Sequence, residues 1–253
     1  MAKQHGIVTF KGTIGDLSFL ETKDGNQVRK KRRAPSKLAL ENDPKFARLR
    51  ENMSEFSRTV QAAKYFRKVF SATLLDCSDK RMSTRLSKAM MKVTVSDPTS
   101  PRGKRKVMNG DASLLNGFAC NISAVMETVF KTEIESGIDR VTGKCTVDIP
   151  AFTPLDKVAA PVGATHFKFH SAAAEINFYD AVREIETAET AAIRLDDVTP
   201  TPANSFVHQL TANSTGHLFL LLGIRFFQEV NGILYPLRND AFNVLEIVAA
   251  ESV

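Results

Sequence analysis

Basic side chains are the residues of this sequence whose type and spacing most clearly suggest chemistry. They form three clusters: a run of five, a stripe with steps of four, three and four, and a group beside prolines and a glycine. The clusters are Arg29, Lys30, Lys31, Arg32 and Arg33; Arg81, Arg85, Lys88 and Lys92; and Arg102, Lys104, Arg105 and Lys106. We call them the 29–33 cluster, the 81–92 stripe and the 102–106 cluster. Because Lys and Arg bind phosphates without reading bases and also pair with carboxylates, the clusters predict contact with nucleic acid or with an acidic protein surface.

The charge of the chain is divided unevenly along its length. Residues 1–110 hold 25 Lys and Arg against 10 Asp and Glu, whereas residues 111–253 hold 9 against 18, and the formal net charge is +6. Such asymmetry predicts two electrostatically different modules, the first suited to an anionic partner. That partner is either nucleic acid or the acidic half of another copy.

Patterns typical of catalysis or of cofactor binding are missing from the sequence. There is no GxSxG motif and no P-loop or dinucleotide-binding loop, and GTIGD at 12–16 is better interpreted as a turn between strands. Cys77, Cys120 and Cys145 are scattered and form no CxxC pair, which favours buried free thiols over disulfides or zinc. We therefore expect no catalytic residues, no cofactor and no small-molecule substrate, with an enzyme of an unrecognised kind as the less favoured alternative.

Two histidines are the residues closest to a metal-binding pattern. His166 and His170 are four apart in THFKFH, so on a strand both side chains point to the same face. His208, His217 or Glu175 could complete a metal site. A solvent-facing pair on an amphipathic strand needs no metal, and we expect no metal here.

The elements that position the basic clusters are short strands followed by two helices. Residues 1–30 alternate apolar and polar side chains around two turns and predict a small antiparallel sheet of two or three strands. Asn42 or Asp43 can cap a helix that begins near Pro44, and the second helix should span residues 78–95. Apolar residues at steps of three and four should face inward. They are Phe46, Leu49, Met53, Phe56, Val60, Ala63, Phe66 and Phe70 in the first helix and Met82, Leu86, Met90 and Val93 in the second.

The rest of the chain reads as short strands separated by turns. Residues 111–253 contain about seven to nine strand-like runs, and Asn231-Gly232 is the clearest hairpin signal. Residues 180–192 fit either a strand or a helix. The predicted fold class is α+β: a β-hairpin arm with a basic linker (1–40), a helical hairpin (41–96), a basic linker (97–110) and a mainly antiparallel β-sandwich, Ig-like or jelly-roll-like (111–253).

The N-terminal part resembles an uncharacterised protein family of Bacteroidota. The resemblance lies in the GTIGDL strand turn at 12–17, the KDG hairpin at 23–25 and an RxNxxEF helix with Arg50, Asn52, Glu55 and Phe56. Where this chain has KKRRAPSK after the hairpin, many members of the family carry a glycine-rich stretch, so the resemblance does not extend to this segment. The resemblance covers about the first 70 to 100 residues and implies no activity. The order of β-arm, helix and β-sandwich is also similar to that of virion or appendage subunits.

These observations predict a non-enzymatic structural subunit that assembles with copies of itself through its β-arm and its oppositely charged halves. The alternative is a sequence-nonspecific nucleic-acid-binding protein that uses the basic half. The sequence shows no run of apolar residues long enough to span a membrane and no secretory signal. We therefore expect cytoplasmic synthesis and a place in a virion or another large assembly.

Overall fold

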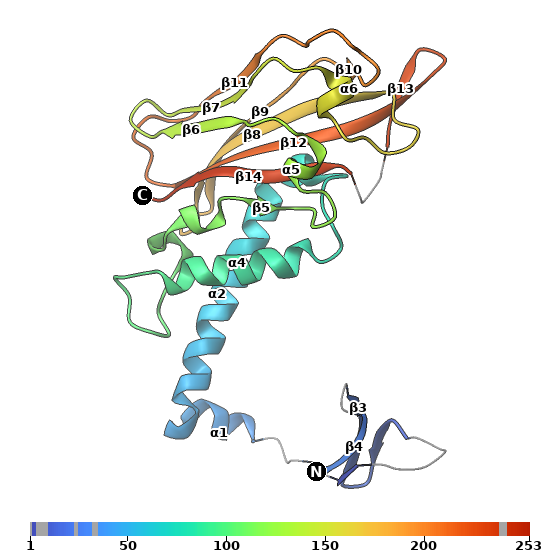
Figure 1. The fold of residues 1–253 in the computed structure, drawn as a ribbon. Coiled ribbons are helices and arrows are strands. Elements are labelled where there is room, and N and C mark those ends of the chain that lie inside the picture. Colours follow the sequence, from blue (N-terminus) through green and yellow to red (C-terminus); the bar gives the residue numbers. More distant parts are fainter. Residues whose placement is uncertain (1, 4–9, 23–24, 32–34, 238–241) are drawn as a thin grey trace. The chain divides into compact units, whose positions relative to one another are not determined.

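A computed structural model describes residues 2–3, 10–22, 25–31, 35–237 and 242–253 (Figure 1). The chain divides into two compact units, residues 1–50 and 51–253, and each is described by itself. Arg32, Arg33 and the Lys23-Asp24 part of the expected KDG turn lie outside the described residues. Both long helices share a core with the C-terminal strands.

An antiparallel sheet makes up most of the first unit. Its strands are β1 (Ala2–Lys3), β2 (Gly12–Ile14), β3 (Leu17–Thr22) and β4 (Gly25–Lys30), in the order β1-β4-β3-β2. Gly15 has a φ of 55° in the turn after β2, a conformation that glycine adopts without strain. None of the side chains described in this unit is buried, and Phe10 and Leu17 are 53% and 45% exposed. The predicted antiparallel sheet is confirmed, with four strands where two or three were expected, and it lacks a core of its own.

Two short helical segments connect this sheet to the long helix. The hydroxyl of Ser36 accepts a hydrogen bond from the Ala39 N–H and begins α1 (Lys37–Asn42). The carboxylate of Asp43 then accepts from the Lys45 N–H at the start of the 3-10 turn η1 (Pro44–Phe46), which leads into α2 (Ala47–Val69). The predicted helix start at Asp43 and Pro44 is thus confirmed.

Helix α2 buries only the second half of its predicted apolar stripe. Ala63 and Phe66 are fully buried, whereas Leu49, Met53 and Phe56 are 42%, 61% and 56% exposed. The expectation that the whole stripe faces inward is wrong, because the packing partners of α2 lie along its C-terminal half. Leu49, Met53 and Phe56 therefore form an exposed apolar stripe on the first half of α2.

The second long helix follows the prediction more closely. After α3 (Ser71–Leu74), helix α4 (Met82–Val95) buries the four predicted residues. It starts four residues later than expected, because the Asp79 carboxylate accepts from the Arg81 N–H and holds residues 79–81 in a turn.

The described part of residues 111–253 contains ten strands. They are β5 (Phe118–Ala119), β6 (Glu135–Asp139), β7 (Lys144–Ile149), β8 (His166–Asn177), β9 (Val182–Glu189), β10 (Ile193–Arg194), β11 (Asn204–Gln209), β12 (His217–Val230), β13 (Ile233–Pro236) and β14 (Val244–Glu251). The larger sheet has the order β10-β8-β12-β14-β5, with β9 paired to β8 and β13 to β12, and the smaller one has the order β11-β7-β6. All pairs are antiparallel, so the α+β prediction is confirmed, and residues 182–189 form a strand.

The larger sheet is covered on both faces (Figure 1). Along β12, Leu220 and Leu222 belong to the core shared with the smaller sheet, whereas Phe219 and Leu221 belong to the core shared with α2 and α4. Because successive side chains of a strand point to opposite faces, an uninterrupted apolar run is what a strand between two layers requires.

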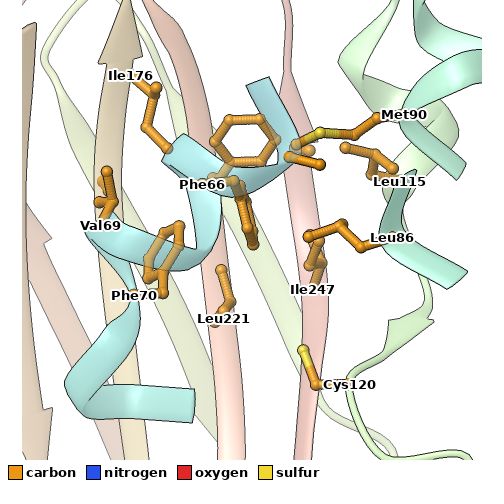
Figure 2. Packing of buried hydrophobic residues seen from close by; sticks show 14 of the residues in the cluster. Phe66, Val69, Phe70, Leu86, Met90, Leu115, Cys120, Ile176, Leu221 and Ile247 are labelled. Atoms are coloured by element: carbon orange, nitrogen blue, oxygen red, sulfur yellow. The ribbon is translucent and has the colours of Figure 1, made fainter. Parts of the chain in front are cut away.

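The helix-side core is dense with aromatic and sulfur-containing side chains. Figure 2 shows Phe66 of α2 close to Met90 of α4, with Leu221 and Ile247 on the strands below. The Phe66 ring meets Phe219 edge to face at 5.1 Å between centroids. Truncating such a buried phenylalanine to alanine typically costs about 3–5 kcal/mol, so this layer fixes α2 and α4 to the sheet.

Residues 97–110, predicted to be a basic linker, form a loop that hydrogen bonds hold in place. The buried carboxylate of Asp97 accepts from the backbone N–H groups of Thr99, Ser100 and Lys106. Glu55 of α2 accepts from the Gly103 N–H at 2.7 Å. The loop also contains the 3-10 turn η2 (Val107–Asn109), and η3 (Ala112–Leu115) follows it.

Candidate interaction surfaces

The 29–33 cluster lies at the end of β4. Arg29 and Lys30 are the last residues of that strand, Lys31 follows it, and all three are exposed. Strand geometry directs Arg29 and Lys30 to opposite faces of the sheet. Arg29 and Lys30 therefore present charge on both sides of the strand end instead of on one flat surface.

The 81–92 stripe is not a uniform surface. Arg81, Lys88 and Lys92 are exposed, but Arg85 is half-buried. Arg85 donates to the carbonyls of Ala119 and Cys120 and pairs with the Asp79 carboxylate. Although burial alone would raise the pKa of Asp79, hydrogen bonds from Arg85 and from two backbone N–H groups hold it below the usual value. Arg85 thus anchors α4 to the end of β5, and only the other three residues offer charge to a partner.

The 102–106 cluster is partly engaged with its own chain. Arg102 donates to the Asn52 amide oxygen and lies 3.5 Å from the Glu51 carboxylate. Lys106 sits over the ring of Tyr179 at 4.4 Å from the centroid. Lys104 is exposed, whereas Arg105 is half-buried and its carbonyl accepts from Arg58.

Aromatic rings gather beside this cluster. Tyr65 of α2, Phe178 and Tyr179 line a cleft of about 330 Å³ together with Arg58 and Lys106. The Tyr65 hydroxyl donates to the carbonyl of Ala181. The sequence places only Tyr65 near basic residues on a helix, since the other two rings come from the chain after β8.

The surface that sequence reasoning missed is acidic. A cleft of about 640 Å³ between α5 (Met126–Val129), β6 and β14 adjoins a hollow of about 450 Å³, and the two share Glu133 and Glu135. We call this pair of depressions the acidic cleft. Its carboxyl groups are those of Glu127, Glu133, Glu135, Asp148 and Glu246. They face a single lysine among the lining residues, Lys131, so the cleft carries an excess of negative charge.

Glu246 is the least solvated acid of the cleft. Burial raises the pKa of its carboxyl group. A hydrogen bond from the Met126 N–H lowers this pKa and the negative charge of Glu127 raises it, and the net effect is a raised pKa. Its Oε2 atom is buried without a hydrogen-bond partner among the described residues. A cationic side chain entering the cleft would stabilise the charged form of Glu246. The sequence gives no local signal for the proximity of Glu246 and Glu127. The two residues are far apart in the chain, and the pairing of β14 with β5 brings their segments together.

The histidines do not come together. His166 and His170 share one face of β8 as expected, but both are buried, so the interpretation as a solvent-facing pair is wrong. His208 bonds to Ser171 from the smaller sheet, on the opposite face of the larger one, and His217 lies against the Val107 carbonyl. Within the described residues, no group of three His, Cys, Asp or Glu side chains could hold a metal ion.

Comparisons of the chain with protein-family models and with curated proteins found no match. The Bacteroidota resemblance therefore stays a prediction. In the part of the chain that the structure describes, no helix is long and apolar enough to cross a membrane.

Proposed function

We propose that the protein is a structural subunit that assembles head to tail with other copies of itself. The observation that carries the proposal is the acidic cleft, which offers five carboxyl groups to the basic end of β4 from a neighbouring copy. Opposite charges on two surfaces steer copies together and fix the register of the contact. No catalytic group takes part in this role.

Unpartnered apolar surface supports the same proposal. The first sheet has no buried side chain among those described, and α2 exposes Leu49, Met53 and Phe56 on one side. Small sheets of this kind need packing from elsewhere to be stable, and contiguous exposed apolar surface is typical of interaction sites. Contact with a second copy would supply that packing.

The contact that we propose joins two different surfaces. A basic strand end on one copy meets an acidic cleft on the next, so an open assembly keeps one free basic strand end and one free acidic cleft, at its two ends, until it closes. Such heterologous contacts generate rings or filaments. This geometry agrees with the role in a virion or another large assembly that the sequence predicts.

Charge reversal tests the contact directly. Lys30→Glu with Lys31→Glu should weaken assembly, and so should Glu133→Lys with Glu135→Lys, because each places like charges across the contact. Combining all four substitutions should restore assembly, since the pairing is then reversed as a whole. Light scattering and electron microscopy at low salt measure the effect, and Lys88→Glu with Lys92→Glu is the matched control.

A strictly monomeric protein at high concentration and low salt would overturn the proposal. Assembly that the control weakens as strongly as the cleft variant would also contradict it, because net charge alone would then explain the effect. All six altered positions are exposed, so misfolding should not confuse the result.

A second candidate function is sequence-nonspecific binding of single-stranded nucleic acid. The aromatic cleft with Tyr65, Phe178 and Tyr179 favours it, because a base could stack on the exposed ring of Tyr179 while Lys106 and Arg58 beside it neutralise phosphates. Binding should weaken steeply as the salt concentration rises. Neutralising Arg81, Lys88 and Lys92 should make the plot of the logarithm of the binding constant against the logarithm of the salt concentration less steep, by roughly one for each phosphate that no longer meets a cation. Absence of binding at low salt would exclude this function.

A further inference from the structure

A small cleft on the helix side of the larger sheet belongs to none of the surfaces above. It has a volume of about 210 Å³ and is lined by residues of α3, β8, β9 and β12, among them Thr73, His170, Glu189 and Arg225. Pockets for drug-sized ligands typically measure about 300–1,000 Å³. The cleft is therefore suited to an ion or a very small molecule.

His170 is held in this cleft by its surroundings. The residue is only 4% exposed, and its register partner on β12 is Gly223. A Cβ atom at Gly223 would lie 2.4 Å from His170 Cε1, so only glycine leaves room for the ring. The Nε2 atom of His170 lies 3.9 Å from the Cys77 sulfur.

The proton on the His170 ring can be placed from these contacts. Burial raises the pKa of the Cys77 thiol to about 11, so the thiol keeps its proton and can donate it weakly to Nε2. Burial and the neighbouring Arg225 lower the pKa of His170 to about 3, so the ring is neutral. With Nε2 accepting, Nδ1 carries the hydrogen, and this atom is buried without a partner among the described residues.

Arg225 supplies a second donor of the same kind. Its Nη2 atom donates to the carbonyls of Ala72 and Thr73 at 3.0 Å each, which fixes the guanidinium against α3. Its Nε atom is buried and has no hydrogen-bond partner within the described part of the chain. Glu189, the acid that lines the cleft, is paired with Lys168 at 2.9 Å.

We propose that this cleft binds a small oxyanion, a carboxylate or phosphate group, whose oxygens accept hydrogen bonds from Arg225 Nε and His170 Nδ1. Two buried donors without acceptors, on two residues that line one cleft, are costly unless something satisfies them, and an oxyanion would satisfy both and also neutralise the arginine. The inference does not rest on the proposed assembly, because the cleft lies within one copy and shares no lining residue with the acidic cleft.

Titration of the full-length protein tests this site, with inorganic phosphate, acetate and chloride as separate probes. Calorimetry should show saturable binding of phosphate or acetate, and the ring signals of His170 should shift in NMR spectra at the same concentrations. Arg225→Gln should weaken binding by about tenfold or more, the usual effect of losing one charged hydrogen bond. Arg183→Gln, at an exposed arginine of β9, is the matched control and should leave binding unchanged.

Three results would overturn the proposal. The His170 signals could stay unmoved by phosphate and acetate, which would mean that water satisfies the two donors. Chloride could bind as tightly as the oxyanions, or Arg183→Gln could weaken binding as much as Arg225→Gln. If Arg225→Gln does not fold, His170→Phe removes the second donor and should weaken binding in the same way, while the NMR titration of the unaltered protein decides independently.

Discussion

Arg85 shows how contacts determine the role of a charged residue. It shares a helix face with exposed basic residues, yet it donates to two carbonyls and pairs with Asp79. Arg85→Ala should lower the free energy of unfolding by about 2–3 kcal/mol, because these half-buried acceptors lose a charged donor. Urea denaturation measures the loss, and Lys88→Ala on the same helix should change stability by less than about 0.5 kcal/mol. Equal effects of the two substitutions would show that Arg85 is as free as its neighbours.

Asp97 should make the stability of the protein depend on pH. Burial alone would raise its pKa, but hydrogen bonds from Thr99, Ser100 and Lys106 outweigh burial and hold the pKa far below the usual value. Because the pKa is lower in the folded state than in the unfolded chain, the carboxylate stabilises the fold above about pH 4. That contribution is lost progressively as the pH falls from about 4 toward the folded-state pKa.

Asp97→Asn tests this dependence. At pH 7 the variant should be less stable by about 1–3 kcal/mol, because the amide presents donors to backbone N–H groups that need acceptors. The difference from the parent protein should shrink as the pH falls below about 4. Chemical denaturation at a series of pH values measures both effects, and a difference that stays constant down to low pH would contradict the assignment.

At the scale of the element, α2 is one helix with two environments. Its second half packs in the helix-side core, while Leu49, Met53 and Phe56 remain exposed. Phe56→Glu should leave the free energy of unfolding nearly unchanged and should weaken self-assembly, because a carboxylate would enter an apolar contact. Ser57→Glu adds the same charge one residue further along and should not disturb assembly. A clear loss of stability in Phe56→Glu alone would instead show that this residue packs within its own chain.

Turns and helix faces that depend on neighbouring residues in the chain could be predicted from the sequence. Asn231 and Gly232 have φ values of 53° and 80°, so the hairpin between β12 and β13 follows from residues that tolerate this turn. The buried face of α4 follows from helical spacing in the same way. The exposure of Phe56 could not be predicted, because periodicity shows which side of a helix is apolar and not whether anything covers it.

The acidic cleft could not be predicted for a different reason. Glu133 and Glu135 are near neighbours in the chain, but Glu246 lies near them only because β6 of the smaller sheet lies beside β14 of the larger one, where the Ser136 hydroxyl donates to the Val248 carbonyl. The same holds for His170 and Arg225, which meet because β8 and β12 are paired over most of their length. Charge counts indicated an acidic half, and the strand order concentrates that charge in one place.

At the scale of the whole molecule, the two units differ in what stabilises them. Both hydrophobic cores lie within residues 51–253, whereas the first unit has no buried side chain among those described. A fragment of residues 43–253, which keeps the Asp43 cap, should therefore unfold cooperatively with a free energy within about 1 kcal/mol of the full chain. The same fragment should fail to assemble, because it lacks the basic end of β4.

Denaturation and light scattering of this fragment separate two roles for the first unit. If the unit contacts only other copies, its removal abolishes assembly without lowering the stability of the monomer. A fragment less stable by several kcal/mol would contradict this, because it would show that the first sheet packs on the rest of its own chain. Adding the fragment to the full-length protein sharpens the comparison: it still offers an acidic cleft but no basic strand end, so it should terminate growing assemblies and reduce their mean size.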